Sequence, residues 1–285
     1  MIEMRESRIA FIGNEEIGSA ALLPESTPSK RADPRPPHKQ FLGLPLCLLP
    51  QQQVLQLIIE RRGAPYRYMI APNANYVVTA HREPERLLPI ARNAWLSICD
   101  SRILRALARL QGMSLPLVTG ADLVAALFSL LNNYDPTHGD RKLLIVGPSR
   151  SMAARLRTAY PNLAFEILPA PPNLINDADA RLSVARDCAG QSWDILLLCV
   201  GVPAQELIAH QIADLKRTTG IALCVGGAVD YLTGVQVRAP VWLQRLYLEW
   251  AYRVARYPRR LWRKQLIESP RVLRIFLMSR WSSQR

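Results

Sequence analysis

Short apolar runs alternate with helical segments along most of this chain. Six runs are predominantly apolar, and they cover residues 66–71, 95–100, 142–147, 164–168, 194–201 and 221–227. Runs of this length that are almost entirely apolar, such as DILLLCVG at 194–201, are typical of parallel strands buried on both faces. The pattern therefore predicts a sheet whose strands carry few polar side chains.

The segments between these runs place apolar residues at helical spacing. They predict helices over residues 51–61, 82–94, 101–111, 122–131, 150–160, 177–189 and 205–215. Strands that alternate with helices indicate an α/β fold, with a mostly parallel sheet covered by helices on both faces. Ligands in such sheets bind beyond the carboxyl ends of the strands.

The C-terminal part, residues 238–285, is expected to form a basic amphipathic helical appendage. A step of 100° per residue from Leu243 gathers the apolar and aromatic residues on one side. That side holds Leu246, Tyr247, Trp250, Val254, Tyr257 and Leu261, and Arg245, Arg253, Arg256, Arg259, Arg260 and Arg263 lie outside it. Pro258 predicts a kink or break just before it. Such a helix packs on the protein or lies in a membrane interface.

The organisation predicted is an extension, a central α/β domain and this appendage. Residues 1–38 contain five prolines among Ser, Lys and Arg, which indicates a disordered extension. The α/β pattern occupies residues 39–237. Residues 238–285 follow as the appendage.

The net charge of +13 is concentrated at the C-terminal end. From Arg238 onward there are twelve Lys or Arg and two Glu, together with four of the six Trp. Basic residues with interfacial aromatics favour an anionic membrane surface, where each basic side chain contributes about 1 kcal/mol. Nucleic-acid binding is the alternative, but the chain lacks a reading motif, so no nucleic-acid partner is expected.

The apolar runs, the N-terminus, the cysteines and the histidines indicate where the protein is located and whether it binds a cofactor. No run of 18 apolar residues occurs, which predicts no membrane-spanning helix, and the charged N-terminus argues against a signal peptide. Five scattered cysteines without CxxC spacing are typical of reduced thiols in a cytosolic protein. Because the four His are dispersed and no acidic pair is suitably placed, no metal site and no cofactor are expected.

Several polar residues follow directly after predicted strands. Asp100 ends the run WLSICD, and the alternative to a catalytic acid is that it caps the helix beginning at Ser101. The block GVPAQE, Gly201–Glu206, ends a strand and begins a helix, where Glu206 could serve only as a partner of the helix dipole. Gly147, in VGPSRS, lies at a strand-to-helix junction where backbone N–H groups could face a phosphate, and the alternative is an ordinary turn.

The chain resembles the WecG/TagA/CpsF glycosyltransferases, glycosyltransferase family 26, from about Leu42 to Lys264. The matching blocks occur in order: LGLPL, PNANYVVTA, ICDS, TGADL, LLIVG, VGVPAQE, VGGAVDYLTGVQVRAP and LEWAYRVARYPRRLWRK. The last three are the most specific.

The resemblance implies a Rossmann-like catalytic domain and inverting, metal-independent sugar transfer. The donor would be a UDP-activated sugar of the N-acetylmannosamine type, and the acceptor a polyprenyl-diphosphate-linked sugar at the cytoplasmic face of the membrane. The product would enter a bacterial surface polysaccharide, and the enzyme would be a peripheral membrane protein. The oligomeric state is left open, and a homo-oligomer is one alternative.

The resemblance also assigns roles to residues. Asp100 is the expected general base. The expected substrate-binding residues are Asn73, Thr119, Gly120, Gly147, Gly201, Pro203, Gln205, Glu206, Gly227 and Asp230. The arginines expected at the diphosphates or the membrane are Arg238, Arg253, Arg256, Arg259, Arg260 and Arg263.

The chain departs from the family pattern at two positions. Leu117 stands where an Arg is expected, so that contact is missing or is supplied by Arg102. Pro72 precedes Asn73 where a hydroxyl residue is commoner. These differences leave open the identity of both sugars, and a catalytically inactive membrane scaffold is a further alternative.

Overall fold

The computed structural model describes residues 34–133, 141–217, 219–240, 242–243, 246, 248–258 and 270–282. Apart from Pro34, these residues belong to one compact unit, Arg35–Arg285. Residues 1–33 of the expected extension lie outside the described residues. The first described strand, β1, begins at His38, within the range that the sequence assigns to the extension.

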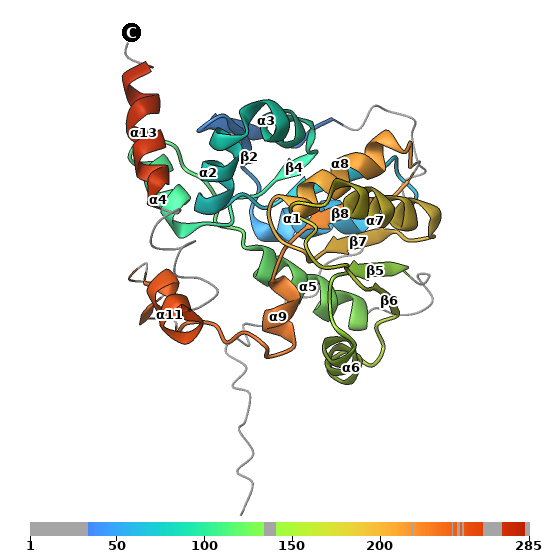
Figure 1. Ribbon diagram of the computed structural model, residues 1–285. Helices are drawn as coiled ribbons and strands as arrows, with labels where there is room; N and C mark the ends of the chain where they lie inside the picture. The colour runs from blue at the N-terminus through green and yellow to red at the C-terminus, as the bar shows by residue number, and fades with distance from the viewer. Residues whose placement is uncertain are drawn as a thin grey trace, which may run out of the picture. The chain divides into compact units, whose positions relative to one another are not determined.

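The described residues form a six-stranded parallel sheet (Figure 1). Its strands are β3 (Arg67–Ile70), β4 (Leu96–Ser97), β5 (Leu143–Val146), β6 (Phe165–Leu168), β7 (Ile195–Leu198) and β8 (Ile221–Cys224). They lie in the order β4-β3-β8-β7-β5-β6, and each neighbouring pair is parallel. This arrangement confirms the predicted α/β fold. A separate antiparallel hairpin joins β1 (His38–Phe41) to β2 (Leu44–Cys47).

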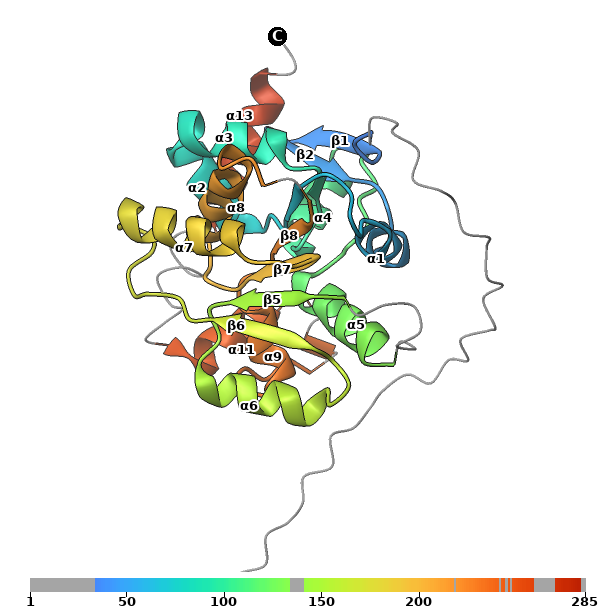
Figure 2. The same cartoon turned by 90° about the vertical axis from the view of Figure 1, so that its right-hand side faces the viewer.

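Helices cover both faces of the sheet. They are α1 (Gln51–Glu60), α2 (Ala74–Arg82), α3 (Pro84–Asn93), α4 (Arg102–Arg109), α5 (Gly120–Asn132), α6 (Arg150–Ala159), α7 (Ala178–Gly190), α8 (Ala204–Asp214) and α9 (Ala228–Leu232). Figure 2 shows α7 and α8 on one side of the strands, with α5 and α6 on the other.

Successive residues of each strand enter two different cores, because side chains alternate across a pleated strand. Leu196 and Leu198 of β7 pack in a cluster with residues of α2, α3, α7 and α8. Ile195 and Leu197 pack in a second cluster, with residues of α1, α5, α6 and α9. Both faces are therefore apolar, which explains the uninterrupted apolar runs in the sequence.

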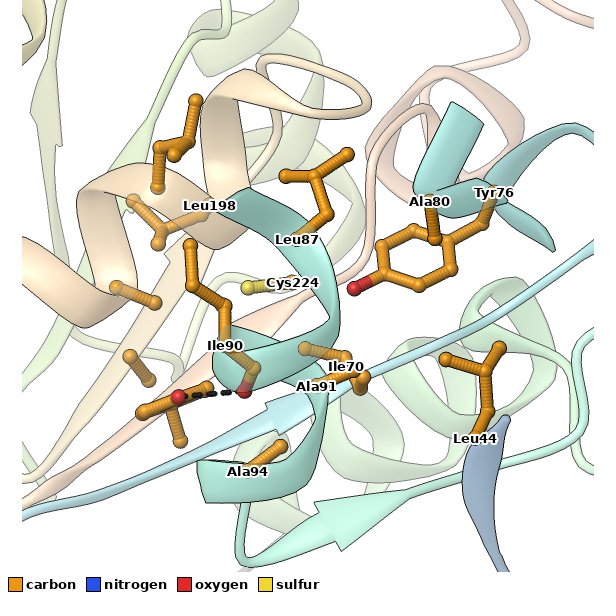
Figure 3. Close-up of a cluster of buried hydrophobic side chains, with 14 of the residues drawn as sticks. Leu44, Ile70, Tyr76, Ala80, Leu87, Ile90, Ala91, Ala94, Leu198 and Cys224 are labelled. Atoms are coloured by element: carbon orange, nitrogen blue, oxygen red, sulfur yellow. Dashed lines mark hydrogen bonds between the residues drawn. The ribbon is translucent and has the colours of Figure 1, made fainter. Parts of the chain in front are cut away.

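Tyr76 lies at the centre of the first core. Figure 3 shows its ring between the hairpin residue Leu44 and the α3 residue Leu87, with its hydroxyl directed toward Cys224. Its side chain is fully buried. The neighbouring Tyr68 hydroxyl donates a hydrogen bond of 2.7 Å to the carbonyl oxygen of Ile90. These contacts fix α2 and α3 against the sheet.

The helix α2 was not predicted, since the sequence places a helix only from residue 82 onward. The side chain of Asn73 accepts a hydrogen bond of 3.0 Å from the Tyr76 N–H, which is the geometry of a helix N-cap. Pro84 then begins α3, where its missing N–H costs nothing. The helix predicted over residues 82–94 therefore corresponds to α3, and α2 is an additional helix that precedes it, with Glu83 between the two.

The described part of the C-terminal appendage is helical, as predicted. It contains α11 (Glu249–Arg256) and α13 (Arg271–Ser282), and α11 ends shortly before Pro258. Phe276 of α13 is buried, with its ring centroid 6.4 Å from that of Phe41. No helix in the described ranges combines the length and apolar character needed to cross a membrane.

We predict that Gly147→Ala destabilises the fold. Gly147 has a φ of 118°, and an added Cβ would lie 2.9 Å from the carbonyl oxygen of Cys199. The strained backbone and the clash should together lower the unfolding free energy by about 2–3 kcal/mol, measured by urea denaturation. Gly190→Ala is the matched control, because Gly190 is helical and nothing lies within 4 Å of its added Cβ. Equal stability of the two variants would contradict this account.

Candidate active site

A cavity of about 410 Å³ lies beyond the carboxyl ends of four adjacent strands, β4, β3, β8 and β7. Its volume is in the range usual for small-molecule sites. The residues predicted from sequence that line it are Asn73, Asp100, Thr119, Gly201, Gln205, Gly227 and Arg238. These residues are distant in the sequence, and the parallel sheet brings them to one edge.

Asp100 lies three residues beyond β4 and is half-buried. Its N–H donates a hydrogen bond of 3.0 Å to the carbonyl oxygen of Pro72, beyond the end of β3. Its Oδ1 accepts one of 3.3 Å from the N–H of Gly120, at the start of α5. The carboxylate is thus held at the cavity by two neighbouring elements.

The alternative that Asp100 caps α4 is wrong. Ser101 is the cap, since its hydroxyl oxygen accepts a hydrogen bond of 3.2 Å from the Leu104 N–H. The Asp100 carboxylate is therefore not required to begin that helix.

Gln205 joins the ends of β7 and β8 at the cavity. Its Oε1 accepts a hydrogen bond of 2.9 Å from the Gly226 N–H, and its Nε2 donates one of 2.8 Å to Glu206 Oε1. Gly226 and Gly201 have φ values of 55° and 83°, the left-handed region that favours glycine. Both Gln205 and Glu206 are buried, and Glu206 does not line the cavity.

Cys224 also lines the cavity, at the end of β8. Burial raises the pKa of this thiol well above its ordinary value, and the charge of Glu206 adds to the effect. The sulfur is therefore a neutral thiol at neutral pH, which disfavours a role as a nucleophile because the thiolate is the reactive form.

Thr119, Asp122 and Arg238 form a polar network at one wall of the cavity. Thr119 caps α5, accepting a hydrogen bond of 3.1 Å from the Asp122 N–H and donating one of 2.6 Å to Asp122 Oδ2. Arg238 Nη1 donates to Asp122 Oδ1, and its Nη2 donates to Thr119 Oγ1 at 3.1 Å. The network connects the start of the appendage to α5.

The ionisation of this network follows from its contacts. Burial raises the pKa of Asp122, but the hydrogen bonds from Arg238 and Thr119 outweigh burial, so the pKa lies below its ordinary value. Burial lowers the pKa of Arg238, and the bond to Asp122 more than restores it. Asp122 and Arg238 are therefore a charged pair at neutral pH.

The cavity carries charges of both signs. Arg102 and Arg238 provide guanidinium groups, while Asp100 and Glu249 provide carboxylates. Leu117, at the position where an Arg was expected, is partly exposed and does not line the cavity. Arg102 is therefore placed where it can supply that contact.

Five of the predicted substrate-binding residues lie outside the lining of this cavity, and four of them lie next to it. Gly120 and Pro203 support it from the first turn of α5 and the cap of α8. Asp230 contacts it indirectly, accepting a hydrogen bond of 2.6 Å from the lining residue Gln236. Glu206 holds Gln205, as described above.

Gly147 instead lines a second cavity of about 280 Å³. That cavity is also bordered by Asn173, Asn176 and Cys199, at the ends of β5, β6 and β7. The structure thus separates Gly147 from the other predicted residues.

The appendage supplies three further lining residues, Glu249, Trp250 and Tyr257. Trp250 and Tyr257 belong to the apolar side predicted for this helix, and the Tyr257 hydroxyl donates a hydrogen bond of 3.2 Å to the carbonyl oxygen of Val235. Arg256 is exposed and outside the lining. The side chain of Arg253 and the whole of Arg259, Arg260 and Arg263 lie outside the described residues.

Three further residues that line the cavity were not predicted from the sequence: Asn75, Tyr231 and Gln236. Asn75 follows Asn73 by two residues at the end of a predicted strand, which was an available signal. Gln236 is the polar residue in the apolar stretch Val235–Val237, but only the folded loop shows that it faces a cavity.

Comparison with known proteins identifies the class to which this fold and site belong. The model of the glycosyl transferase WecG/TagA/CpsF family matches residues 39–285. The chain belongs to this family of glycosyl transferases.

Two curated relatives carry the name N-acetylglucosaminyldiphosphoundecaprenol N-acetyl-beta-D-mannosaminyltransferase. The protein from Bacillus subtilis (strain 168) is 28% identical over 152 residues, which are 52% of this chain and 55% of that protein. The protein from Bacillus spizizenii (strain ATCC 23059 / NRRL B-14472 / W23) is 28% identical over 153 residues, with the same shares. The chain thus matches about half the length of each relative.

We predict that Asp122→Asn reduces stability at neutral pH but not in acid. Because the folded pKa of Asp122 is depressed, its stabilisation is present above the unfolded value of about 3.9 and is lost as pH falls through the folded pKa. The pair is 38% and 41% exposed, so the loss at pH 7 should be at most about 1 kcal/mol. Urea denaturation of both proteins from pH 3 to 7 measures the difference in unfolding free energy. Adding Arg238→Gln to Asp122→Asn should lower the unfolding free energy little further, because the charged pair is already lost. A difference that persists unchanged at pH 3 would exclude this origin.

Proposed function

We propose that this chain is an inverting, metal-independent glycosyltransferase. It moves a sugar of the N-acetylmannosamine type from UDP to a polyprenyl-diphosphate-linked sugar during bacterial surface-polysaccharide synthesis. Family membership supports the class of reaction, and the names of the two Bacillus relatives support the sugars. The observation that carries the proposal is the presence of the Asp100 carboxylate in one cavity with Arg102 and Arg238.

Asp100 is the proposed general base. It would accept the proton of the acceptor hydroxyl as that oxygen attacks the anomeric carbon from the face opposite UDP. The new carbon–oxygen bond forms while the bond to the diphosphate breaks, so the configuration inverts. A positioned base of this kind contributes about 10²–10⁴-fold to the rate.

Arginines are proposed to stabilise the departing diphosphate. Their forked donors match phosphate oxygens, and fixed positive charge at the leaving group lowers the barrier without a metal. Arg102 and Arg238 line the cavity. Arg253 and Arg256 of the appendage, which lie in the sequence between the lining residues Trp250 and Tyr257, are proposed to contribute as well. Asn73, whose oxygen caps α2, retains an amide group that can donate to the nucleotide sugar.

The appendage is proposed to bring the enzyme to the cytoplasmic face of the membrane, where a lipid-linked acceptor resides. Its exposed residues include Trp242 and Leu246, which are 61% and 60% exposed. Exposed aromatic and apolar side chains among arginines suit an anionic lipid interface. Because the same segment supplies Trp250 and Tyr257 to the cavity, membrane contact and substrate binding would occur together.

We expect Asp100→Asn to lower kcat for sugar transfer by about 10²–10⁴-fold while UDP binding is retained. The assay uses a short-lipid-diphosphate N-acetylglucosamine acceptor with UDP-N-acetylmannosamine, UDP-N-acetylglucosamine and UDP-glucose, with and without EDTA. Transfer should continue in EDTA.

Asp187→Asn is the control, since Asp187 is an exposed carboxylate on α7. Full activity of Asp100→Asn would refute the base assignment, and loss of transfer in EDTA would refute metal independence. A folded wild-type protein that binds none of the donors would instead favour the scaffold.

The double variant Arg253→Gln/Arg256→Gln should lose at least tenfold in kcat/KM on the lipid-linked acceptor. A water-soluble acceptor separates the two proposed roles of these arginines. If they act only at the membrane, transfer to the soluble acceptor stays at the wild-type rate. If they neutralise the diphosphate, both acceptors are affected, and an unchanged rate on the soluble one contradicts that role.

A further inference from the structure

Two amide side chains on the cavity wall have an unused acceptor atom. Asn75 and Gln236 each line the cavity, and each is only 9% exposed. Asn75 Oδ1 and Gln236 Oε1 have no hydrogen-bond partner among the described residues. Buried polar atoms in folded proteins are nearly always paired, so two such oxygens on one cavity indicate that a ligand completes them.

The orientation of the Gln236 amide is fixed by Asp230. Gln236 Nε2 donates a hydrogen bond of 2.6 Å to Asp230 Oδ2, and its backbone N–H donates one of 2.9 Å to the carbonyl oxygen of Asp230. An ionised carboxylate only accepts hydrogen bonds, so the amide nitrogen must face Asp230. Consequently Oε1 is the atom left for another partner.

The same pair is packed against the turn that follows β8. A Cβ at Gly227 would lie 3.4 Å from Asp230 Oδ2 and 3.5 Å from Gln236 Nε2. The Gln236 side chain is therefore restricted both by its hydrogen bond to Asp230 and by the nearby Gly227. Because it is already ordered, it loses little side-chain entropy when a ligand binds.

The chemistry of the two oxygens selects their ligand. An amide oxygen accepts from N–H and O–H groups, whereas an ionised diphosphate has only acceptor oxygens and suits Arg102 and Arg238 instead. The wall with Asn75 and Gln236 thus matches the uncharged, hydrogen-bond-donating part of a nucleotide sugar. Such groups are present on the base, on the sugar hydroxyls and on an acetamido substituent.

We propose that Gln236, oriented by Asp230, and Asn75 are specificity-determining residues that accept hydrogen bonds from N–H or O–H groups of the bound nucleotide sugar. The inference rests on the proposed use of a UDP-sugar donor. It assigns Asp230 a positioning role and gives Gln236 and Asn75 the direct contacts. Substrates that lack the matching donor group are disfavoured because they leave a buried acceptor unpaired.

The test is calorimetric binding of UDP, UDP-N-acetylmannosamine and UDP-mannose to the full chain and to Gln236→Met and Asn75→Leu. These replacements keep the side-chain size and remove the acceptor. Each variant should bind its matching ligands about tenfold more weakly. Weaker binding of UDP itself assigns the contact to the nucleoside. Weaker binding of both UDP-sugars, with UDP unchanged, assigns it to sugar hydroxyls, and loss of the preference for UDP-N-acetylmannosamine assigns it to the acetamido N–H.

Gln211→Met is the matched control, because Gln211 Oε1 is also buried and unpartnered but lies on α8 outside the cavity lining. It should bind all three ligands like the wild type. Circular dichroism and melting temperature verify that every variant is folded.

The positioning role of Asp230 is tested by a double-mutant cycle. Asp230→Asn lets the Gln236 amide turn, because Asn can donate to Oε1, so it should weaken binding about as much as Gln236→Met. The double variant Asp230→Asn/Gln236→Met should then bind the ligand about as weakly as either single variant. If the losses in binding free energy add, Asp230 does not act through Gln236.

The possible failures are distinguishable. If the wild type binds UDP-sugars and both Gln236→Met and Asn75→Leu bind them with the same affinity, this inference is overturned. The proposed function is not affected by that result. Failure of the wild type to bind any nucleotide sugar overturns the proposed function, and the inference with it.

Discussion

The burial of both faces of the parallel sheet is the constraint on which the rest of this structure depends. Ile195 and Leu197 enter one core and Leu196 and Leu198 the other, so β7 has no face on which a polar group could meet solvent. Polar side chains can therefore gather only where strands end. All strands of the sheet are parallel, and their carboxyl ends meet at one edge. The cavity with Asp100 and Gln205 lies at that edge.

Hydrogen bonds from one strand end to the next give this edge its shape. Gln205 follows β7 and accepts from Gly226 beyond β8, while Asp100 follows β4 and accepts from Gly120 at the start of α5. Each bond uses a side chain to satisfy a backbone N–H in a region without regular pairing. The same bonds hold Asp100 and the turn at Gly226 in fixed positions. Fixed positions of this kind would pre-organise a site for the proposed transfer.

The appendage completes the cavity through polar and aromatic contacts. Arg238 is bonded to Asp122 and Thr119, and Tyr257 is bonded to Val235. Trp250 and Tyr257 close one side of the cavity with the apolar face of the segment whose other face is basic. Contact with lipid and substrate by one segment belongs to the proposed function, and this arrangement of the two faces is consistent with it.

The sequence by itself determined the parallel α/β fold, the positions of most strands and helices, and the family. Continuous apolar runs indicate strands buried on both faces. Motif blocks such as VGVPAQE are contiguous in the sequence, so the family can be read without the structure. It also placed Asp100 at a strand end. Only the tertiary structure decided that Ser101 caps α4 while Asp100 turns to Gly120, that Gly147 lies at a different cavity, and that Gln236 meets Asp230 beside Asn75. These outcomes depend on contacts between segments far apart in the chain, and hydrophobic periodicity contains no information about which distant polar groups will meet.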